Sequence, residues 1–158
     1  MTVIGIDPGL KGGIVVMIDG RIARTVKMPV VKGDGGSWVD FGEVASILKY
    51  ERPDIVAIEK VHSMPGQGVA SVFTFGLGFG GLIGVCAGLS APYKLVRPQE
   101  WQKKEFSGMD KKLGKGRGIL YVKQRFPECE PAHKHDGIAD AACIAEYASI
   151  NWPLGAAL

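Results

Sequence analysis

The feature that most constrains the fold of this chain is a long stretch without charged residues. No Asp, Glu, Lys or Arg lies between Val61 and Tyr93, and an apolar helix of about 20 residues can span a bilayer. The segment Met64-Pro65-Gly66-Gln67-Gly68 interrupts the front of the stretch. Glycines recur every four residues behind it, at Gly76, Gly80, Gly84 and Gly88. This stripe lets another backbone approach closely, in a membrane or in a packed protein. Because the break leaves only a short, glycine-rich helix, we expect a soluble protein rather than a membrane protein.

The length and composition point to one folded domain. The chain has 158 residues, of which 46% are hydrophobic and 22% charged, and this balance excludes a disordered chain. We therefore expect a single domain over residues 1–158. The sequence has three cysteines and no CxxC motif, which argues against a disulfide framework or a zinc site. Asp7 lies where a signal peptide needs its apolar stretch, so we expect an intracellular protein.

The pattern of apolar residues predicts an α/β architecture. Short β-branched runs at 2–6, 12–18 and 21–27 read as an antiparallel meander, with Asp19-Gly20 as a type I′ turn. We read Pro29–Ser37 as a loop. Further helices are expected at 38–50, 68–89, 98–106, 116–126 and 136–150, and further strands at 55–58 and 93–96. Such an order predicts a mixed sheet covered by helices on both faces.

Two carboxylates follow predicted strands. Asp7 ends the first strand and precedes the turn Pro8-Gly9, so its side chain is expected to point into a cleft. Glu59 follows the apolar run 55–58, and because an unpaired charge inside that run would be costly, Glu59 belongs at the strand end. Each also has an ordinary explanation, a turn cap for Asp7 and an exposed strand exit for Glu59.

Two more carboxylates lie at the start of the last predicted helix. Asp136 and Asp140 are four residues apart, hence on one face, where like charges repel by a few tenths of a kcal/mol. An N-cap role would explain Asp136 but not Asp140. All four carboxylates can converge only around a hard cation such as Mg²⁺, which accepts oxygen ligands. Two such ions can activate water and stabilise the leaving oxygen of a phosphodiester, so the predicted chemistry is phosphoryl transfer.

Three sequence blocks resemble the RuvC family of Holliday junction resolvases. They are VIGIDPGLKGG at the start, VAIEKVHSMPGQGVASVFTFG in the middle and KHDGIADAACIAEYA at the end. The run from Glu59 through MPGQG into a glycine-rich helix, followed by LVRPQEWQKKEF, is more similar to phage-borne and chloroplast-type members than to the standard bacterial enzyme. The resemblance covers nearly the whole chain.

The resemblance implies both a fold and an activity. The fold is RNase H-like, with a mixed five-stranded sheet of three antiparallel N-terminal strands followed by parallel strands. The activity is symmetric nicking of four-way DNA junctions by a homodimer in a bacterial cytoplasm, or by a phage enzyme in its host. The expected cofactors are two Mg²⁺ ions per site, with Mn²⁺ as a substitute and no small-molecule cofactor. The implied catalytic residues and metal ligands are Asp7, Glu59, Asp136 and Asp140.

One position departs from the family pattern. Standard members place the two C-terminal ligands three residues apart, whereas Gly137 occupies that position here. Asp136 would have to serve instead of a residue at 137. His135 could also reach the metal or act as a helper base, although an exposed helix-start residue is an equally good reading. Lys11 or Lys134 could neutralise developing charge, and the spacing does not choose between them.

A basic stretch and a probing loop are the expected DNA contacts. From Lys111 to Arg125 there are six basic residues and no acidic one, which favours phosphate binding over a solvated helix face. By resemblance, residues after Glu59 probe bases at the junction centre, and the helix at 69–89 pairs two subunits. The expected DNA-binding residues are His62, Met64, Gln67, Phe73, Lys103, Lys104, Lys111, Lys112, Lys115 and Arg117.

Three other functions compete with this reading. A sugar-kinase-type ATPase needs two such domains, for which this chain is too short. An RNase H-like nuclease acting on other branched DNA or on structured RNA would share the carboxylates and the basic surface. A non-catalytic junction-binding protein would not need all four carboxylates, so cleavage that depends on metal separates it from an enzyme.

Overall fold

The core of the molecule is a five-stranded mixed sheet with the strand order β3-β2-β1-β6-β7. The computed structural model describes residues 1–34, 36–62, 66, 68–114 and 116–152. Strands β1, β2 and β3 pair antiparallel, whereas β6 and β7 continue the sheet parallel to β1. The strand bounds are β1 Thr2–Asp7, β2 Gly13–Ile18, β3 Arg21–Lys27, β6 Ile55–Glu59 and β7 Tyr93–Val96. The predicted mixed sheet and its strand directions are confirmed.

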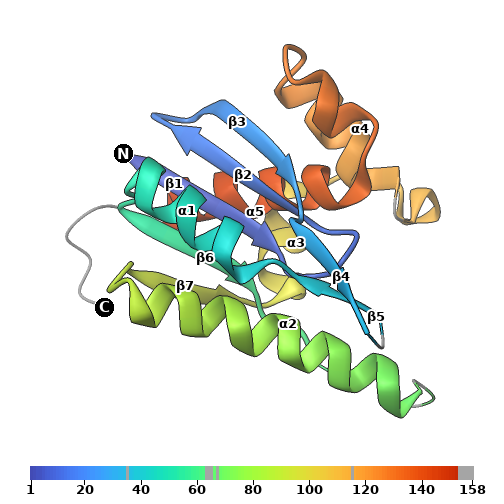
Figure 1. Ribbon diagram of the computed structural model, residues 1–158. Helices are drawn as coiled ribbons and strands as arrows, with labels where there is room; N and C mark the ends of the chain where they lie inside the picture. The colour runs from blue at the N-terminus through green and yellow to red at the C-terminus, as the bar shows by residue number, and fades with distance from the viewer. Residues whose placement is uncertain (35, 63–65, 67, 115, 153–158) are drawn as a thin grey trace.

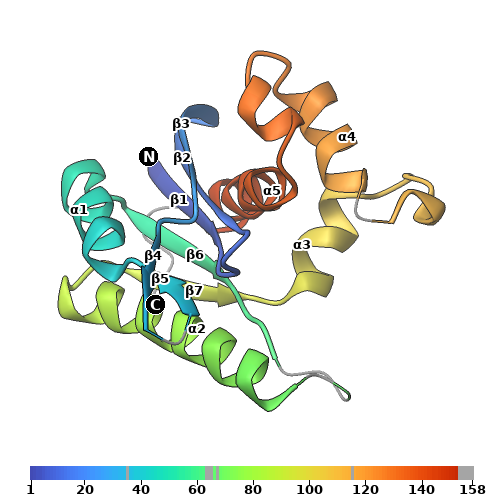
Figure 2. The ribbon, with the colours of Figure 1, turned by 45° about the vertical axis from the view of Figure 1, so that its right-hand side comes forward.

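Helices cover both faces of this sheet (Figure 1). The helix bounds are α1 Phe41–Glu51, α2 Val69–Gly88, α3 Pro98–Glu105, α4 Gly116–Arg125 and α5 Asp136–Asn151. Figure 2 shows α5 between the sheet and the pair α3 and α4, with α1 and α2 on the opposite face. Two buried clusters match these layers, because alternate strand residues such as Val3 and Ile4 belong to different clusters. Short 3₁₀ turns at Lys111–Leu113 and Glu130–His133 complete the chain.

The stretch read as a loop at Pro29–Ser37 is instead mostly a β-hairpin. Strands β4 (Val30–Gly33) and β5 (Gly36–Val39) pair antiparallel as a separate two-stranded sheet. The indole of Trp38 covers Gly33, where a Cβ would lie 2.3 Å from the ring. The loop prediction was wrong because Gly33 packs under the Trp38 ring and the two strands pair with each other. In contrast, the type I′ turn is confirmed, since Asp19 and Gly20 both have positive φ.

Glycines allow α5 to lie directly on the first two strands. A Cβ on Gly5 would lie 2.2 Å from the carbonyl oxygen of Ala141, and one on Gly137 would lie 2.4 Å from that of Lys11. Gly12 and Gly137 form a β-bridge at the start of the helix. These contacts fix the N-terminal end of α5 against the end of β1, because any side chain there would push the helix away.

A buried polar network joins α3, α4 and α5. The Tyr121 hydroxyl contacts the carboxylates of Glu105 and Glu146, which are 8% and 3% exposed. The Arg125 guanidinium donates to Glu146 at 2.6 Å. The Tyr121 hydroxyl has one hydrogen to share between the two carboxyl groups, and burial raises the pKa of Glu105. The network holds the three helices in one layer.

Candidate functional site

A pocket of about 500 Å³ lies where strands β1 and β6 end and helix α5 begins. Strands β1 and β6 are parallel neighbours, so their carboxyl ends meet at one edge of the sheet. The start of α5 lies beside this edge through the contacts of Gly12 and Gly137. The acidic residues that line the pocket are Asp7, Glu59, Asp136 and Asp140. The structure therefore places all four predicted carboxylates in one pocket.

Local backbone structure orients the first carboxylate. Asp7 is the last residue of β1, and Pro8 turns the chain directly after it. The amide of Gly9 donates to Asp7 Oδ1 at 3.4 Å, and the amide of Gly12 donates to the Gly9 carbonyl at 2.8 Å. This tight turn keeps the Asp7 side chain at the strand end instead of folding it over the sheet.

The two carboxylates of α5 are held in different ways. His135 is the N-cap of the helix, and its Nδ1 accepts from the amide of Ile138 at 3.2 Å. Asp136 is in the first turn and exposed, whereas Asp140 is half-buried one turn further on. Gly118 of α4 packs against this second carboxylate, since a Cβ there would lie 2.7 Å from Asp140 Oδ1. The N-cap position, which was the ordinary alternative explanation for Asp136, is occupied by His135.

The Glu59 carboxylate lies in a partly buried environment close to Asp7. Burial, followed by the negative charge of Asp7, raises the pKa of Glu59 to about 7. The Trp101 indole opposes this rise in pKa, because its Nε1 donates to Glu59 Oε1 at 3.0 Å. Two interacting carboxylates in a partly buried pocket create a site where a cation would be stabilised.

The oxygen donors of the pocket are of the kind that hard divalent cations bind. Mg²⁺ is usually held by one or two carboxylates together with waters and substrate phosphates. Among the residues that the structure describes, no three His, Cys, Asp or Glu side chains are close enough to hold one ion by themselves. The four carboxylates thus fit Mg²⁺ as one-ligand or two-ligand sites completed by water or phosphate oxygens, and not as a closed protein cage.

Positive and polar groups border the carboxylates on two sides. Lys11 lines the pocket from the β1–β2 turn, and Arg117 lines it from α4. The Arg117 guanidinium lies 4.9 Å from the centroid of the Phe106 ring and donates to the Gly114 carbonyl at 3.2 Å. A negatively charged group in the pocket would therefore meet positive charge from Lys11 and from Arg117.

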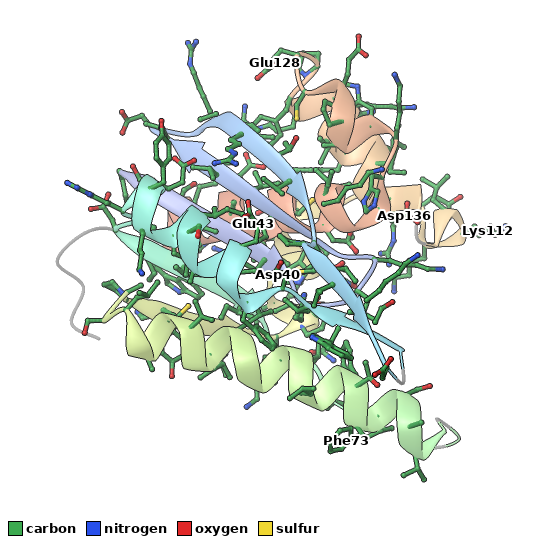
Figure 3. All side chains as sticks on the ribbon, in the orientation of Figure 1. Asp40, Glu43, Phe73, Lys112, Glu128 and Asp136 are labelled. Carbon is green, nitrogen blue, oxygen red and sulfur yellow. The ribbon has the colours of Figure 1, made fainter. Side chains whose placement is uncertain are left out.

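The predicted DNA-binding residues separate into several places. Arg117 lies in the acidic pocket, while His62 and Lys103 line a neighbouring groove. Lys104 points elsewhere, because its ammonium contacts Asn151 and lies 5.7 Å from the Tyr147 ring centroid. The exposed residues Lys111, Lys112 and Phe73 lie outside both, on a 3₁₀ turn and on α2 (Figure 3). Met64, Gln67 and Lys115 fall outside the described residues.

Two of the undecided helper residues have other roles in the structure. His135 uses Nδ1 to cap α5, so in its neutral form the proton is on Nε2 and the ring can donate but not ligate there. Lys134 pairs with Glu130 at 3.2 Å on the surface. Of the two lysines that the sequence left open, Lys11 is the one that lines the pocket.

Sequence reasoning missed the pocket residues of α3. Trp101 is 1% exposed and contacts Glu59, and Gln102 lines the pocket beside it. The signal available in the sequence was Pro98, which marks a helix start directly after the strand next to β6. A helix in that position must place one face beside the end of β6, and that face carries Trp101.

The sheet order, the layers and the position of the pocket define an RNase H-like α/β fold. No protein-family model matches the sequence, and no curated protein sequence matches it either. Solved structures do match.

The chain is similar to Thermus thermophilus RuvC in complex with a Holliday junction substrate, with 21% identity and a TM-score of 0.65 over 93% of this chain and 92% of the other. A second Thermus thermophilus RuvC structure gives 22% identity and a TM-score of 0.64 over 93% and 92% of the two chains. The yeast mitochondrial Holliday junction resolvase Ydc2 gives 15% identity and a TM-score of 0.57 over 92% and 76%. These likenesses establish the fold.

Proposed function

We propose that the protein is a Mg²⁺-dependent endonuclease that nicks four-way DNA junctions. The observation that carries this proposal is the gathering of Asp7, Glu59, Asp136 and Asp140 in one pocket from three separate segments. The structurally similar RuvC in complex with a Holliday junction substrate supports branched DNA as the substrate class. The resemblance of the three sequence blocks points to the same substrate.

In this proposal the four carboxylates hold the metal ions and the neighbouring cations hold the substrate. Bound Mg²⁺ would supply activation of water and stabilisation of the leaving oxygen during phosphodiester hydrolysis. Asp7 and Glu59 would hold metal from the sheet edge, and Asp136 and Asp140 from α5. Arg117 and Lys11 would contact phosphate oxygens beside the cut bond. Mn²⁺, which prefers the same oxygen ligands, would replace Mg²⁺.

The surface of α2 supports a homodimer as part of this proposal. By length and composition α2 could cross a membrane. Within this chain, 17% of the most apolar stretch of the helix is buried. Val69, Phe73 and Leu77, which are four residues apart, are 87%, 72% and 47% exposed. A Cβ on Gly76, Gly80, Gly84 or Gly88 would meet nothing within 4 Å. A second copy packed on this face would cover apolar surface and present two equivalent sites to a two-fold junction.

The deciding experiment is strand cleavage of a synthetic four-way junction. Paired, symmetric nicks that need Mg²⁺ and disappear with chelator are expected on the junction and not on a linear duplex of the same sequence. Asp7→Asn should reduce cleavage by more than about a hundredfold, since even partners of metal ligands are worth 10- to 100-fold. Junction binding by this variant should be unchanged or tighter, because one negative charge near the phosphates is removed.

The matched control is Glu128→Gln, which removes an exposed negative charge far from Asp136 (Figure 3). It should cleave like the unmodified protein. Cutting of every substrate in the presence of metal would instead identify a general nuclease of the same fold. Cutting of structured RNA in place of the junction would identify the related RNA-directed activity. Tight junction binding without cleavage would identify a non-catalytic junction-binding protein.

A further inference from the structure

A second groove, of about 540 Å³, lies directly beside the carboxylate pocket. It is bounded by the end of β6 on one side and by the start of α3 on the other. The lining residues are Lys60, Val61, His62, Arg97, Pro98, Gln99, Glu100 and Lys103. The groove therefore carries three permanent cations, one histidine and one carboxylate. Its charge is opposite to that of the acidic pocket.

The single carboxylate of the groove is already paired. Glu100 accepts from the Arg97 guanidinium and from the Arg97 amide, each at 2.9 Å. Arg97, followed more weakly by the charge of Lys60, lowers the pKa of Glu100. Glu100 thus orients Arg97. Because Glu100 is paired with Arg97, Lys60 and Lys103 are not fully neutralised by the lining of the groove. A polyanion is the ligand that such a surface favours.

The groove and the acidic pocket share one wall. Glu59 lines the pocket and Lys60 lines the groove, as expected of consecutive residues that point to opposite sides of an extended chain. On α3, Gln102 faces the pocket, whereas Gln99 and Lys103 face the groove one helical turn apart. Pro98 lines both. A chain of phosphates that leaves the acidic pocket over Pro98 therefore enters the basic groove.

The backbone of the groove is fixed before any ligand binds. The Lys60 amide donates to the Val96 carbonyl at 2.7 Å, which extends the pairing of β6 with β7 past Glu59. Pro98 at the first position of α3 and the Arg97–Glu100 contacts hold the opposite wall. Cations on preformed walls lose little freedom on binding, so their contacts with phosphates contribute more fully to affinity.

We propose that this groove binds the sugar-phosphate backbone of the DNA strand that is cut, at the phosphates adjacent to the scissile one. The inference rests on the proposed nuclease function and assigns a position on the substrate to residues outside the metal site. Lys60, Arg97 and Lys103 neutralise these phosphates, and His62 lies at the exposed rim.

The first test compares two double variants that each remove two positive charges. Lys60→Gln/Lys103→Gln changes the groove, and Lys49→Gln/Arg52→Gln changes a cleft at the opposite ends of β6 and β7. Binding of a four-way junction is measured in Ca²⁺ over a range of salt concentrations. The groove variant should bind more weakly, and the slope of log K against log salt should fall by about two, one for each lost phosphate contact. The control should keep the slope of the unmodified protein.

The second test locates the phosphates. Uncharged methylphosphonate linkages are placed one at a time on either side of the cut site in the cleaved strand. The unmodified protein should lose affinity when a linkage next to the scissile phosphate is neutral, and the groove variant should lose less at the same linkage. Equal losses for both proteins at every linkage, or an unchanged salt slope, would overturn the inference while leaving junction cleavage intact. Absence of any junction binding by the unmodified protein would overturn the proposed function and the inference together.

Discussion

The Trp101 indole donates a hydrogen bond from Nε1 to Glu59 Oε1 at 3.0 Å. The ring is 1% exposed and meets Phe106 edge-on, with ring centroids 5.3 Å apart, so its orientation is fixed by packing. One oxygen of the Glu59 carboxylate is therefore occupied by a hydrogen bond within the protein. The other remains available for the pocket, which is how a buried partner orients a metal-binding carboxylate.

Trp101→Phe should weaken metal binding while the fold remains intact. The phenyl ring fills most of the same space but cannot donate, so the Glu59 carboxylate loses its orientation. We expect Mg²⁺ affinity, measured by calorimetry without DNA, to fall by about 10- to 100-fold. Cleavage should recover partly at high Mg²⁺. Trp38→Phe, in the β4–β5 hairpin, is the control. Equal Mg²⁺ affinity in the two variants would remove Trp101 from the support of the site.

The stability of the metal-free protein should fall as the pH rises from about 4.5 to 7. Burial and Asp7 raise the pKa of Glu59 from its ordinary 4.5 to about 7, so the folded state binds more protons than the unfolded state across this interval. Glu59→Gln removes the cost of ionisation. We therefore expect the variant to gain about 1–3 kcal/mol relative to the unmodified protein at pH 8 and little at pH 4.5. Urea denaturation with chelator at both pH values measures the difference.

The same titration predicts how the pH affects metal binding. Since the metal requires the ionised carboxylate, Mg²⁺ binding below pH 7 should release a proton, and affinity should decrease as the pH falls. Proton release is measured by calorimetry in buffers of different ionisation enthalpy. An affinity that is constant between pH 5.5 and 8 would contradict the assignment of Glu59 as a ligand.

Gly118→Ala should reduce cleavage with a smaller effect on stability. A Cβ at this position would lie 2.7 Å from Asp140 Oδ1, so the carboxylate must move. Gly116→Ala, in the same helix, would meet nothing within 4 Å and serves as the control. We expect single-turnover cleavage to fall by at least about tenfold in Gly118→Ala and to stay unchanged in the control. Equal rates in both would show that Asp140 tolerates displacement.

Gly80→Lys should dissociate the proposed homodimer. A lysine fits on the free chain, because a Cβ at Gly80 would meet nothing within 4 Å, but it would separate two helices packed on this face. Sedimentation should give a monomer for the variant and a dimer for the unmodified protein. Ser46→Lys, on the exposed side of α1, controls for the added charge. A monomeric unmodified protein would contradict the homodimer.

Tyr121→Phe should destabilise the helical layer that carries α3. The hydroxyl contacts Glu105 and Glu146, and both carboxyl groups lose this partner when it is removed. Leaving a buried polar group unsatisfied costs about 1–3 kcal/mol. Tyr50→Phe, at a residue that is 79% exposed, should be neutral. The free energy of unfolding in urea distinguishes the two, and a loss below about 0.5 kcal/mol for Tyr121→Phe would show that water replaces the hydroxyl.

Local signals in the sequence predicted most of the fold. The β-branched runs and the turn at Asp19-Gly20 predicted the meander, and the apolar spacing predicted all five helices within a few residues. Asp7 and Glu59 were each predicted at the end of a strand, and the parallel pairing of β1 with β6 brings these ends together. The β4–β5 hairpin was missed, since Gly33 lies under Trp38, a contact that spacing along the chain does not reveal. Trp101 was missed for a similar reason, because its partner Glu59 lies far away in the sequence.

Helix α5 packs on the first two strands through Gly5, Gly12 and Gly137. The pocket is therefore complete only when α5 is present. Asp7 is translated before Asp136 and Asp140, so the four carboxylates can meet only after α5 has been translated. A growing or prematurely terminated chain that lacks α5 therefore lacks two of the four pocket carboxylates and has no helix to close the sheet edge. Under the proposed nuclease function, such a fragment should not cleave DNA.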